Sequence, residues 1–258
     1  MEYRKNDIVT LEIVDCGTDG EGIGKADGFT VFVKDAVIGD TVTAKIMKAK
    51  KNYGYGRLME ILKPSPYRVE PVCPSARQCG GCQLQAVSYE EQKVFKEKKL
   101  RGHLERIGGF RDLPMEPMIG MDEPYHYRNK AQFPVGRNKE GRIITGFYAG
   151  RTHAIIENRD CALGIPQNKE ILDIVIAHME KYGIAPYDEM TGKGLVRHIF
   201  VRYGFFTGEL MVCLIINGKS LPHSEKLVEA LRKIDGMTSI SINCNTGRTN
   251  VILGRKTV

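Results

Sequence analysis

Residues 72–85 read V-C-P-S-A-R-Q-C-G-G-C-Q-L-Q and divide a strand-rich beginning from a mixed remainder. Three of the seven cysteines of the chain lie in this stretch: Cys73, Cys79 and Cys82. Three thiolates on one tight loop can hold three corners of a cubane cluster while a fourth arrives from a distant segment. Cys161, in N-R-D-C-A-L-G, is the candidate for that fourth ligand. The pattern therefore predicts a [4Fe-4S] site.

Zinc is the main alternative at these cysteines. Structural zinc sites usually pair two short C-x2-C knuckles, and only Cys79 and Cys82 make one here. The spacing favours a cluster, although zinc or no metal at all stays open. Disulfides are not expected, because the number of cysteines is odd and no signal peptide opens the chain. The remaining cysteines are expected to be small buried apolar residues: Cys16, Cys213 and Cys244.

Composition sets the outer limits of fold and partner. A chain of 258 residues with 42% hydrophobic content is expected to form one large or two small domains. No apolar run approaches membrane-spanning length, so we expect no membrane partner. The chain is expected to be cytoplasmic and monomeric. The 38 Lys and Arg against 31 Asp and Glu give a formal net charge of +7. This charge is compatible with a polyanionic partner but does not by itself indicate one.

Residues 1–64 are predicted to form a small β-barrel of the oligonucleotide-binding type. Several short strand-like segments alternate with glycine-rich turns such as T-D-G-E-G-I-G at 18–24 and V-I-G-D at 37–40. The expected strands are Ile8–Cys16, Thr30–Val33, Thr41–Met47 and Tyr55–Ile61.

Cations and aromatic residues are interleaved near the end of this barrel, which is typical of a nucleic-acid surface. The predicted contacts to phosphates and bases are Lys50, Lys51, Tyr53 and Arg57. The ordinary alternative is a solvated hairpin edge on which lysines prevent aggregation.

Residues 65–111 are predicted to hold the cysteine loop and a connecting helix. Ser88 and Glu91 have the spacing of a capping box, and Gly108-Gly109 provides the stop. The predicted apolar stripe is Val94, Leu100, Leu104 and Ile107.

Residues 112–258 are predicted to form one α+β domain with a hairpin across Thr207-Gly208. The expected helices are Lys169–Tyr182 and Ser224–Ile234. The expected strands are Lys130–Val135, Ile143–Tyr148, His198–Phe206, Leu210–Ile216, Thr238–Asn243 and Val251–Leu253.

Taken together, these motifs resemble the bacterial RNA (uracil-5-)-methyltransferases that modify ribosomal RNA. The motifs that carry the resemblance are the TRAM-like barrel, the C-P-x4-C-G-G-C-Q-x-Q loop, Y-R-N-K at 127–130, G-F-Y at 146–148, Cys161 and R-T-N-V-I-L-G at 248–254. The resemblance implies a [4Fe-4S] cluster on the four cysteines, which organises the RNA-binding face, and large-subunit ribosomal RNA as the partner. Position in the second domain adds further predicted RNA contacts: Arg128, Asn129 and Lys130. A structural ion pair is the alternative role for Arg128 and Lys130.

The resemblance also implies that methyl transfer takes place elsewhere. Family members continue into a doubly wound domain that binds S-adenosylmethionine and carries a catalytic cysteine and a general-base glutamate. No glycine-rich turn with the context of such a domain occurs before Val258, so we expect a truncated, catalytically silent fragment with no catalytic residue and no S-adenosylmethionine site. Two alternatives stay open, a stand-alone iron–sulfur RNA-binding module and an iron–sulfur redox enzyme.

Overall fold

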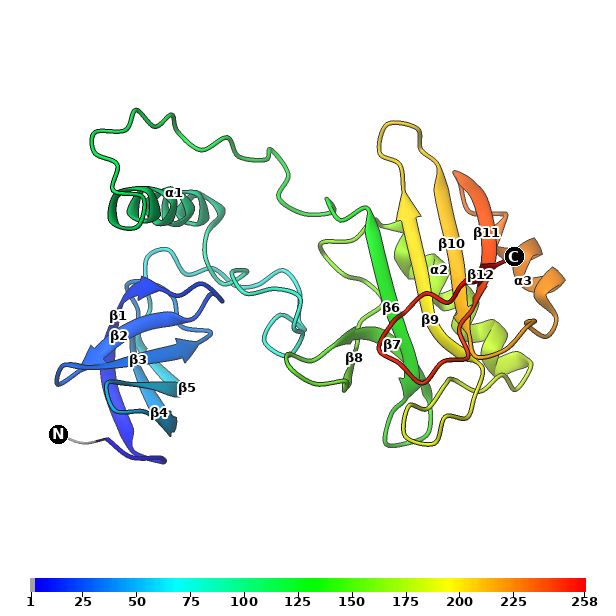
Figure 1. Cartoon of the computed structure of the whole chain (residues 1–258), viewed down its shortest axis with the longest axis horizontal. Coiled ribbons are helices and arrows are strands. Elements are labelled where there is room, and N and C mark those ends of the chain that lie inside the picture. The colour runs from blue at the N-terminus through cyan, green and yellow to red at the C-terminus, as the bar shows by residue number, and fades with distance from the viewer. Residues whose placement is uncertain (1–2) are drawn as a thin grey trace. The chain divides into compact units, whose positions relative to one another are not determined.

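The computed structural model describes residues 3–258, which divide into two compact units (Figure 1). Unit 1 comprises Met1–Arg77 and Cys82–Asp122, and unit 2 comprises Gln78–Gly81 and Glu123–Val258. Each unit is built around a hydrophobic core of its own. Residues 78–81 lie between two segments of unit 1 in the sequence but belong to unit 2, so part of the cysteine loop lies in unit 2.

The N-terminal part of unit 1 is a closed five-stranded barrel with strand order β1-β2-β3-β5-β4. Its strands are β1 (Ile8–Cys16), β2 (Gly22–Ala26), β3 (Phe29–Lys34), β4 (Thr41–Ala49) and β5 (Tyr53–Lys63). Alternate residues of each strand point inwards, so that Val9, Leu11 and Ile13 of β1 are all buried. The predicted barrel is confirmed, together with the positions of its four predicted strands.

Strand β2 corrects the prediction of a turn over residues 18–24. Only the first half of that segment turns, and Gly22–Ala26 pairs with both β1 and β3. A Cβ atom added to Gly24 would lie 2.3 Å from the carbonyl oxygen of Glu12. Glycine is therefore needed here for close approach of two strands, a use of glycine that resembles a turn signal in the sequence.

Helix α1 (Tyr89–Arg106) begins as predicted, but its apolar stripe is not buried. The Ser88 Oγ accepts a hydrogen bond from the Glu91 backbone N–H at 3.4 Å, while the Ser88 N–H donates to the Tyr67 carbonyl. The capping box is therefore only half formed. Glu91 is the buried residue of the helix, whereas Val94 and Leu100 are exposed, because no described segment of unit 1 covers them.

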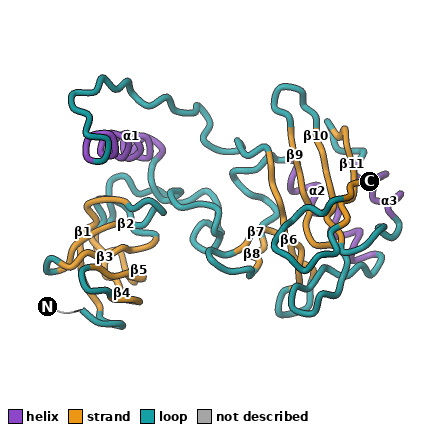
Figure 2. Tube along the Cα trace, in the orientation of Figure 1, coloured by secondary structure: helices purple, strands orange, loops and turns teal. Residues whose placement is uncertain are grey.

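Unit 2 contains a seven-stranded sheet in the order β12-β11-β10-β9-β6-β7-β8, with two helices (Figure 2). The strands are β6 (Lys130–Arg137), β7 (Ile143–Tyr148), β8 (Ile155–Glu157), β9 (Val196–Tyr203), β10 (Leu210–Ile216), β11 (Met237–Cys244) and β12 (Lys256–Thr257). The helices are α2 (Gln167–Lys181) and α3 (Ser224–Leu231). β9 and β10 form the predicted antiparallel hairpin, and α3 connects β10 to the parallel strand β11. The short strands β8 and β12 were not predicted.

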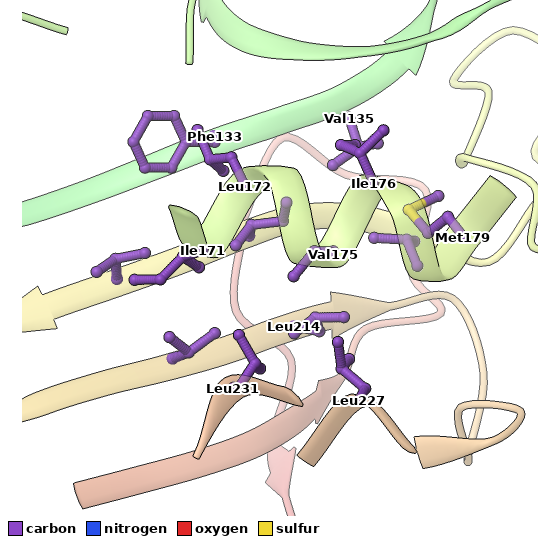
Figure 3. Close-up of a cluster of buried hydrophobic side chains, with 14 of the residues drawn as sticks. Phe133, Val135, Ile171, Leu172, Val175, Ile176, Met179, Leu214, Leu227 and Leu231 are labelled. Atoms are coloured by element: carbon purple, nitrogen blue, oxygen red, sulfur yellow. The ribbon is translucent and has the colours of Figure 1, made fainter. Parts of the chain in front are cut away.

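The main core of unit 2 lies between α2, α3 and one face of this sheet (Figure 3). Ile171, Leu172, Val175, Ile176 and Met179 recur at helical spacing along α2 and are all buried. They pack against strand residues from β6 and β10 and against leucines of α3. The mixed α/β fold of this domain was therefore predictable from periodicity.

A segment without regular structure, residues 245–255, lies over the opposite face of the sheet, where Ile252 packs against Phe200, Cys213 and Ile215. We call it the strap. The predicted strand Val251–Leu253 lies in the strap and is wrong. The Asn245 side-chain amide donates to the carbonyls of Val251 and Ile252 at 2.7 and 2.9 Å. Side chains thus satisfy the backbone groups that a neighbouring strand would otherwise pair.

Within residues 3–258, no helix combines the length and the apolar composition that crossing a bilayer requires.

Candidate nucleic-acid interface

Three aromatic rings gather on the outside of the barrel, and we call them the aromatic face: Phe32, Tyr53 and Tyr55. Phe32 of β3 is the register partner of Tyr55 in the parallel strand β5. The ring centroids lie 5.6 to 5.8 Å apart, and the two tyrosines are 37% and 39% exposed. Exposed clustered rings of this kind provide stacking surfaces for bases.

The sequence Y-G-Y-G-R in β5 explains how the aromatic face forms. Gly54 and Gly56 point into the barrel, where a Cβ atom on Gly56 would lie 3.1 Å from side-chain atoms of Ala44 and Val31. The alternate residues must then point outwards. Small residues inside allow the barrel to close, and large residues outside remain available to a ligand.

Basic side chains border the aromatic face. Arg57 is the register partner of both Lys34 and Lys45, and Lys48 is the partner of Tyr55. Among residues 3–258, Lys45, Lys48 and Arg57 form no ion pair with a carboxylate. These cations are therefore available to phosphates.

The predicted barrel contacts fall on this side of the barrel. Tyr53 and Arg57 are exposed on β5, and Lys50 and Lys51 are exposed in the connection from β4 to β5. The sequence prediction missed Phe32, which the alternation of F-T-V-F-V-K in β3 places on the outer surface. The alternative of a guarded hairpin edge does not fit, because β5 pairs with β3 on one side and β4 on the other.

The predicted contacts of unit 2 lie where β6 begins. Asn129 accepts a backbone hydrogen bond from Tyr203 at 2.9 Å, which fixes the chain beside β9. The half-buried Arg128 guanidinium lies 5.9 Å from the centroid of the Phe147 ring. Lys130 is exposed and lies opposite Arg202 in the neighbouring strand. The structure thus places Asn129 and Lys130 at an accessible surface, while Arg128 packs partly against an aromatic ring.

The alternative role of a structural ion pair does not fit Arg128 and Lys130. In the described part of the chain, neither Arg128 nor Lys130 pairs with a carboxylate. Lys130 and Arg202 instead lie 6.0 and 5.3 Å from the centroid of the Phe200 ring. Arg202 was not predicted, although its alternation with Phe200 along β9 is readable in the sequence.

The four predicted cluster ligands are divided between the units. Cys73 and Cys82 belong to unit 1, and Cys79 and Cys161 belong to unit 2. Cys73 and Cys79 are buried, and the other two thiols are half-buried. Among residues 3–258, no three His, Cys, Asp and Glu side chains are grouped so as to hold a metal ion. The ligand set therefore remains a prediction.

Local hydrogen bonds nevertheless suit thiolate ligands. Gln85 accepts a hydrogen bond from the Cys73 backbone N–H at 3.2 Å and donates one to the Cys82 sulfur at 3.1 Å. The Cys79 sulfur accepts a hydrogen bond from the Gly81 N–H at 3.4 Å. N–H groups aimed at sulfur stabilise the deprotonated form and tune bound clusters. Cys73 and Cys82 also line a cavity of about 370 Å³ within unit 1, which Arg68 and Phe95 border.

Cys16 and Cys213 lie in environments that oppose deprotonation of their thiols. Burial raises the pKa of the Cys16 thiol to about 11, and burial also raises the pKa of Cys213. Cys213 is buried as predicted, whereas Cys16 and Cys244 are only half-buried, because Cys16 ends a strand and Cys244 adjoins the strap. A protonated thiol is a poor nucleophile, so Cys16 and Cys213 are not candidate catalytic groups.

Comparison with known proteins supports this picture of the barrel. Residues 4–59 match the TRAM domain family. The chain is 44% identical over its whole length to an uncharacterized RNA methyltransferase of Clostridium tetani and 45% identical over 98% of its length to one of Halalkalibacterium halodurans. It spans 56% of each of these relatives, or about half of their length.

A solved structure shares the fold. The crystal structure of Pyrococcus abyssi tRNA (uracil-54, C5)-methyltransferase in complex with S-adenosyl-L-homocysteine superposes with a TM-score of 0.67. The match covers 96% of this chain and 55% of that one at 23% sequence identity. At this identity the likeness concerns the fold alone.

Proposed function

We propose that these residues form the RNA-recognition portion of an S-adenosylmethionine-dependent RNA (uracil-5-)-methyltransferase that acts on ribosomal RNA. The observation that carries the proposal is the aromatic face of the TRAM barrel, bordered by Lys45, Lys48 and Arg57, which pair with no carboxylate of residues 3–258. The relatives named RNA methyltransferases support the reaction class. In this proposal residues 1–64 and 112–258 contact RNA as a monomer, and residues 65–111 hold most of the cluster ligands.

Methylation of C5 of uracil requires a thiolate that attacks C6, transfer of the methyl group to C5, and then removal of the C5 proton, which expels the thiolate from C6 and restores the double bond. We assign these steps and the S-adenosylmethionine site to a part of the protein outside the 258 residues. The share of the relatives that this chain spans, 56%, supports this assignment. The contribution of units 1 and 2 is to bind and orient the RNA.

Separate variants of one aromatic ring, Tyr55, and of two charges, Lys50 and Lys51, test the proposed RNA interface. Tyr55→Leu should weaken binding of an unpaired ribosomal RNA oligonucleotide about tenfold or more, because it removes a stacking surface. The double variant Lys50→Gln with Lys51→Gln should reduce the slope of log affinity against log salt by about 1.4, since two phosphate contacts are lost. Both quantities come from fluorescence anisotropy titrations at several salt concentrations.

Glu60→Gln serves as the matched control on the same barrel, because it is exposed on β5 beyond the aromatic face. It should not weaken binding. If Tyr55→Leu binds as tightly as the wild type and the salt slope of the lysine variant is unchanged, the barrel face is not the RNA interface. Tighter binding of a transfer RNA arm than of ribosomal RNA would contradict the proposed target while supporting the reaction class.

We also propose that Cys73, Cys79, Cys82 and Cys161 bind one [4Fe-4S] cluster with a structural role. The N–H···S hydrogen bonds at Cys79 and Cys82 support it. Protein purified without oxygen should contain about four irons and four sulfides per chain. Cys161→Ala should lose the cluster and weaken RNA binding. Iron and acid-labile sulfide analysis with a visible spectrum gives the measurement.

Cys244→Ala is the matched control, because this cysteine is also half-buried in unit 2 but lies outside the proposed ligand set. It should retain the full cluster. Zinc without sulfide in the wild type would establish the zinc alternative. A Cys161→Ala protein that keeps its cluster but gains reactivity towards reductants would favour the redox alternative.

A further inference from the structure

The tip of the β9–β10 hairpin presents two adjacent aromatic rings to solvent. Residues 204–209 read G-F-F-T-G-E between Tyr203 and Leu210. Phe205 is 52% exposed and Phe206 is fully exposed. The Phe205 ring meets the Tyr203 ring edge-on at 5.2 Å. Figure 1 shows this connection extending beyond the ends of the neighbouring strands.

Hydrogen bonds within the tip hold its shape without help from the rings. Gly204 donates to the Glu209 carbonyl at 2.9 Å, and Gly208 donates to the Gly204 carbonyl at 2.8 Å. Gly208 has a φ of +72°, which suits glycine at this turn. The base is fixed by a hydrogen bond from Leu210 to the Gly236 carbonyl at 2.8 Å. The phenyl ring of Phe206 therefore has no evident part in folding.

Two like charges lie on the neighbouring strands β6 and β9, a short distance from the tip. Arg202 and Lys130 are direct cross-strand partners on the sheet, and both are exposed. Like charges in this position repel each other. Among the described residues neither forms an ion pair, and the nearest acidic side chain along the hairpin is the exposed Glu209. A bound anion would relieve the repulsion.

We propose that this hairpin is a second single-strand RNA site, in which an unpaired nucleobase stacks on Phe206 while a phosphate lies at Lys130 and Arg202. Phe206 lies four positions after Arg202, which limits the distance between their Cα atoms to about 14 Å. A ring and a pair of cations within this reach match the alternation of base and phosphate along one strand. The inference rests on the proposed RNA-binding function and extends it to a named part of unit 2.

The size of the tip favours RNA over a protein partner. Two phenylalanine rings can bury at most about 150–250 Å² each, and a stable protein interface buries about 800 Å² on each partner. The side chains beside the rings are the polar Thr207 and Glu209. A single base needs only one face of one ring, so the tip is large enough for stacking.

Binding by the full 258-residue chain tests the proposal, with a fluorescent unpaired oligoribonucleotide and its duplex form as probes. Phe206→Leu should weaken binding of the unpaired strand about tenfold and leave the salt slope and duplex affinity unchanged. Phe206→Trp should retain wild-type affinity. Lys130→Gln with Arg202→Gln should reduce the salt slope by about 1.4. Met190→Ala, an equally exposed apolar side chain in another loop of unit 2, should change nothing.

The outcomes separate this inference from the proposed function. If Tyr55→Leu weakens binding but Phe206→Leu does not, the hairpin site is wrong and the barrel interface stands. If the wild-type chain binds no RNA, both fail. If Phe206→Leu leaves RNA affinity intact and abolishes self-association in sedimentation experiments, the tip is a protein interface and the inference is overturned.

Discussion

Replacing Asp40 by alanine should lower the free energy of unfolding of unit 1 by about 3–5 kcal/mol, the range typical of breaking a buried ion pair from one side. Asp40 is fully buried and accepts hydrogen bonds from the Arg68 guanidinium at 3.0 and 2.5 Å. It also accepts the backbone N–H groups of Val37 and Ser65. Alanine removes the acceptor of both backbone N–H groups and of the Arg68 Nε, and Arg68 keeps its hydrogen bond to the Asp35 carbonyl. Hydrogen exchange of the barrel amides reports the stability of unit 1 separately.

The same variant should change the response to acid. Burial alone raises the pKa of Asp40, but hydrogen bonds from Arg68, Ser65 and Val37 outweigh it and lower the pKa below its ordinary value. A carboxyl with a lowered folded-state pKa stabilises the protein above its unfolded value of about 3.9, and this contribution is lost as the pH falls through the folded value. The difference between wild type and Asp40→Ala should therefore shrink below about pH 4.

Asp35→Asn provides the matched control for Asp40→Ala, because asparagine tolerates the φ of +67° that Asp35 adopts. Asp35 pairs with the exposed Arg77 side chain at 3.5 Å, and exposed pairs contribute about 1 kcal/mol or less. A loss of stability at Asp35 as large as that at Asp40 would show that burial of the Asp40 pair is not the cause.

Arg197→Met should destabilise unit 2 by about 3 kcal/mol, because it removes charged hydrogen bonds that hold the strap. The buried guanidinium of Arg197 donates to the carbonyls of Asn245, Gly247 and Thr249 at 2.9, 2.7 and 3.2 Å. It also lies 4.4 Å from the centroid of the Tyr187 ring. Exchange of the strap amides should accelerate more than exchange of the amides in α2.

Arg248→Met is the matched control for Arg197→Met, because Arg248 is exposed and makes one hydrogen bond, to the Thr191 carbonyl at 2.9 Å. It should cost well under 1 kcal/mol. If the strap amides of Arg197→Met exchange as slowly as in the wild type, the asparagine side chains alone hold the strap.

Local pattern was enough to predict most of the fold. The alternation of Val9, Leu11 and Ile13 and the helical spacing along α2 each contain their own burial signal. Prediction from local sequence pattern was wrong where one residue type can serve two structural roles. Gly24 resembles a turn residue but permits close contact between two strands. Val251–Leu253 resembles a strand, but the carbonyls of Val251 and Ile252 accept hydrogen bonds from the Asn245 side chain. The spacing of apolar residues in α1 likewise contains no information on whether another segment covers them.

The sequence by itself determined the barrel, the two helices of unit 2, the cysteine pattern and the basic character of residues 50–57. These features depend on neighbours in the chain, whose periodicity and spacing can be read directly. Only the tertiary structure decided that Phe32 joins Tyr53 and Tyr55, that Lys130 faces Arg202, and that the two phenylalanines stand exposed beyond β9. Strand register sets such contacts between distant segments, and register follows from how whole sheets pack.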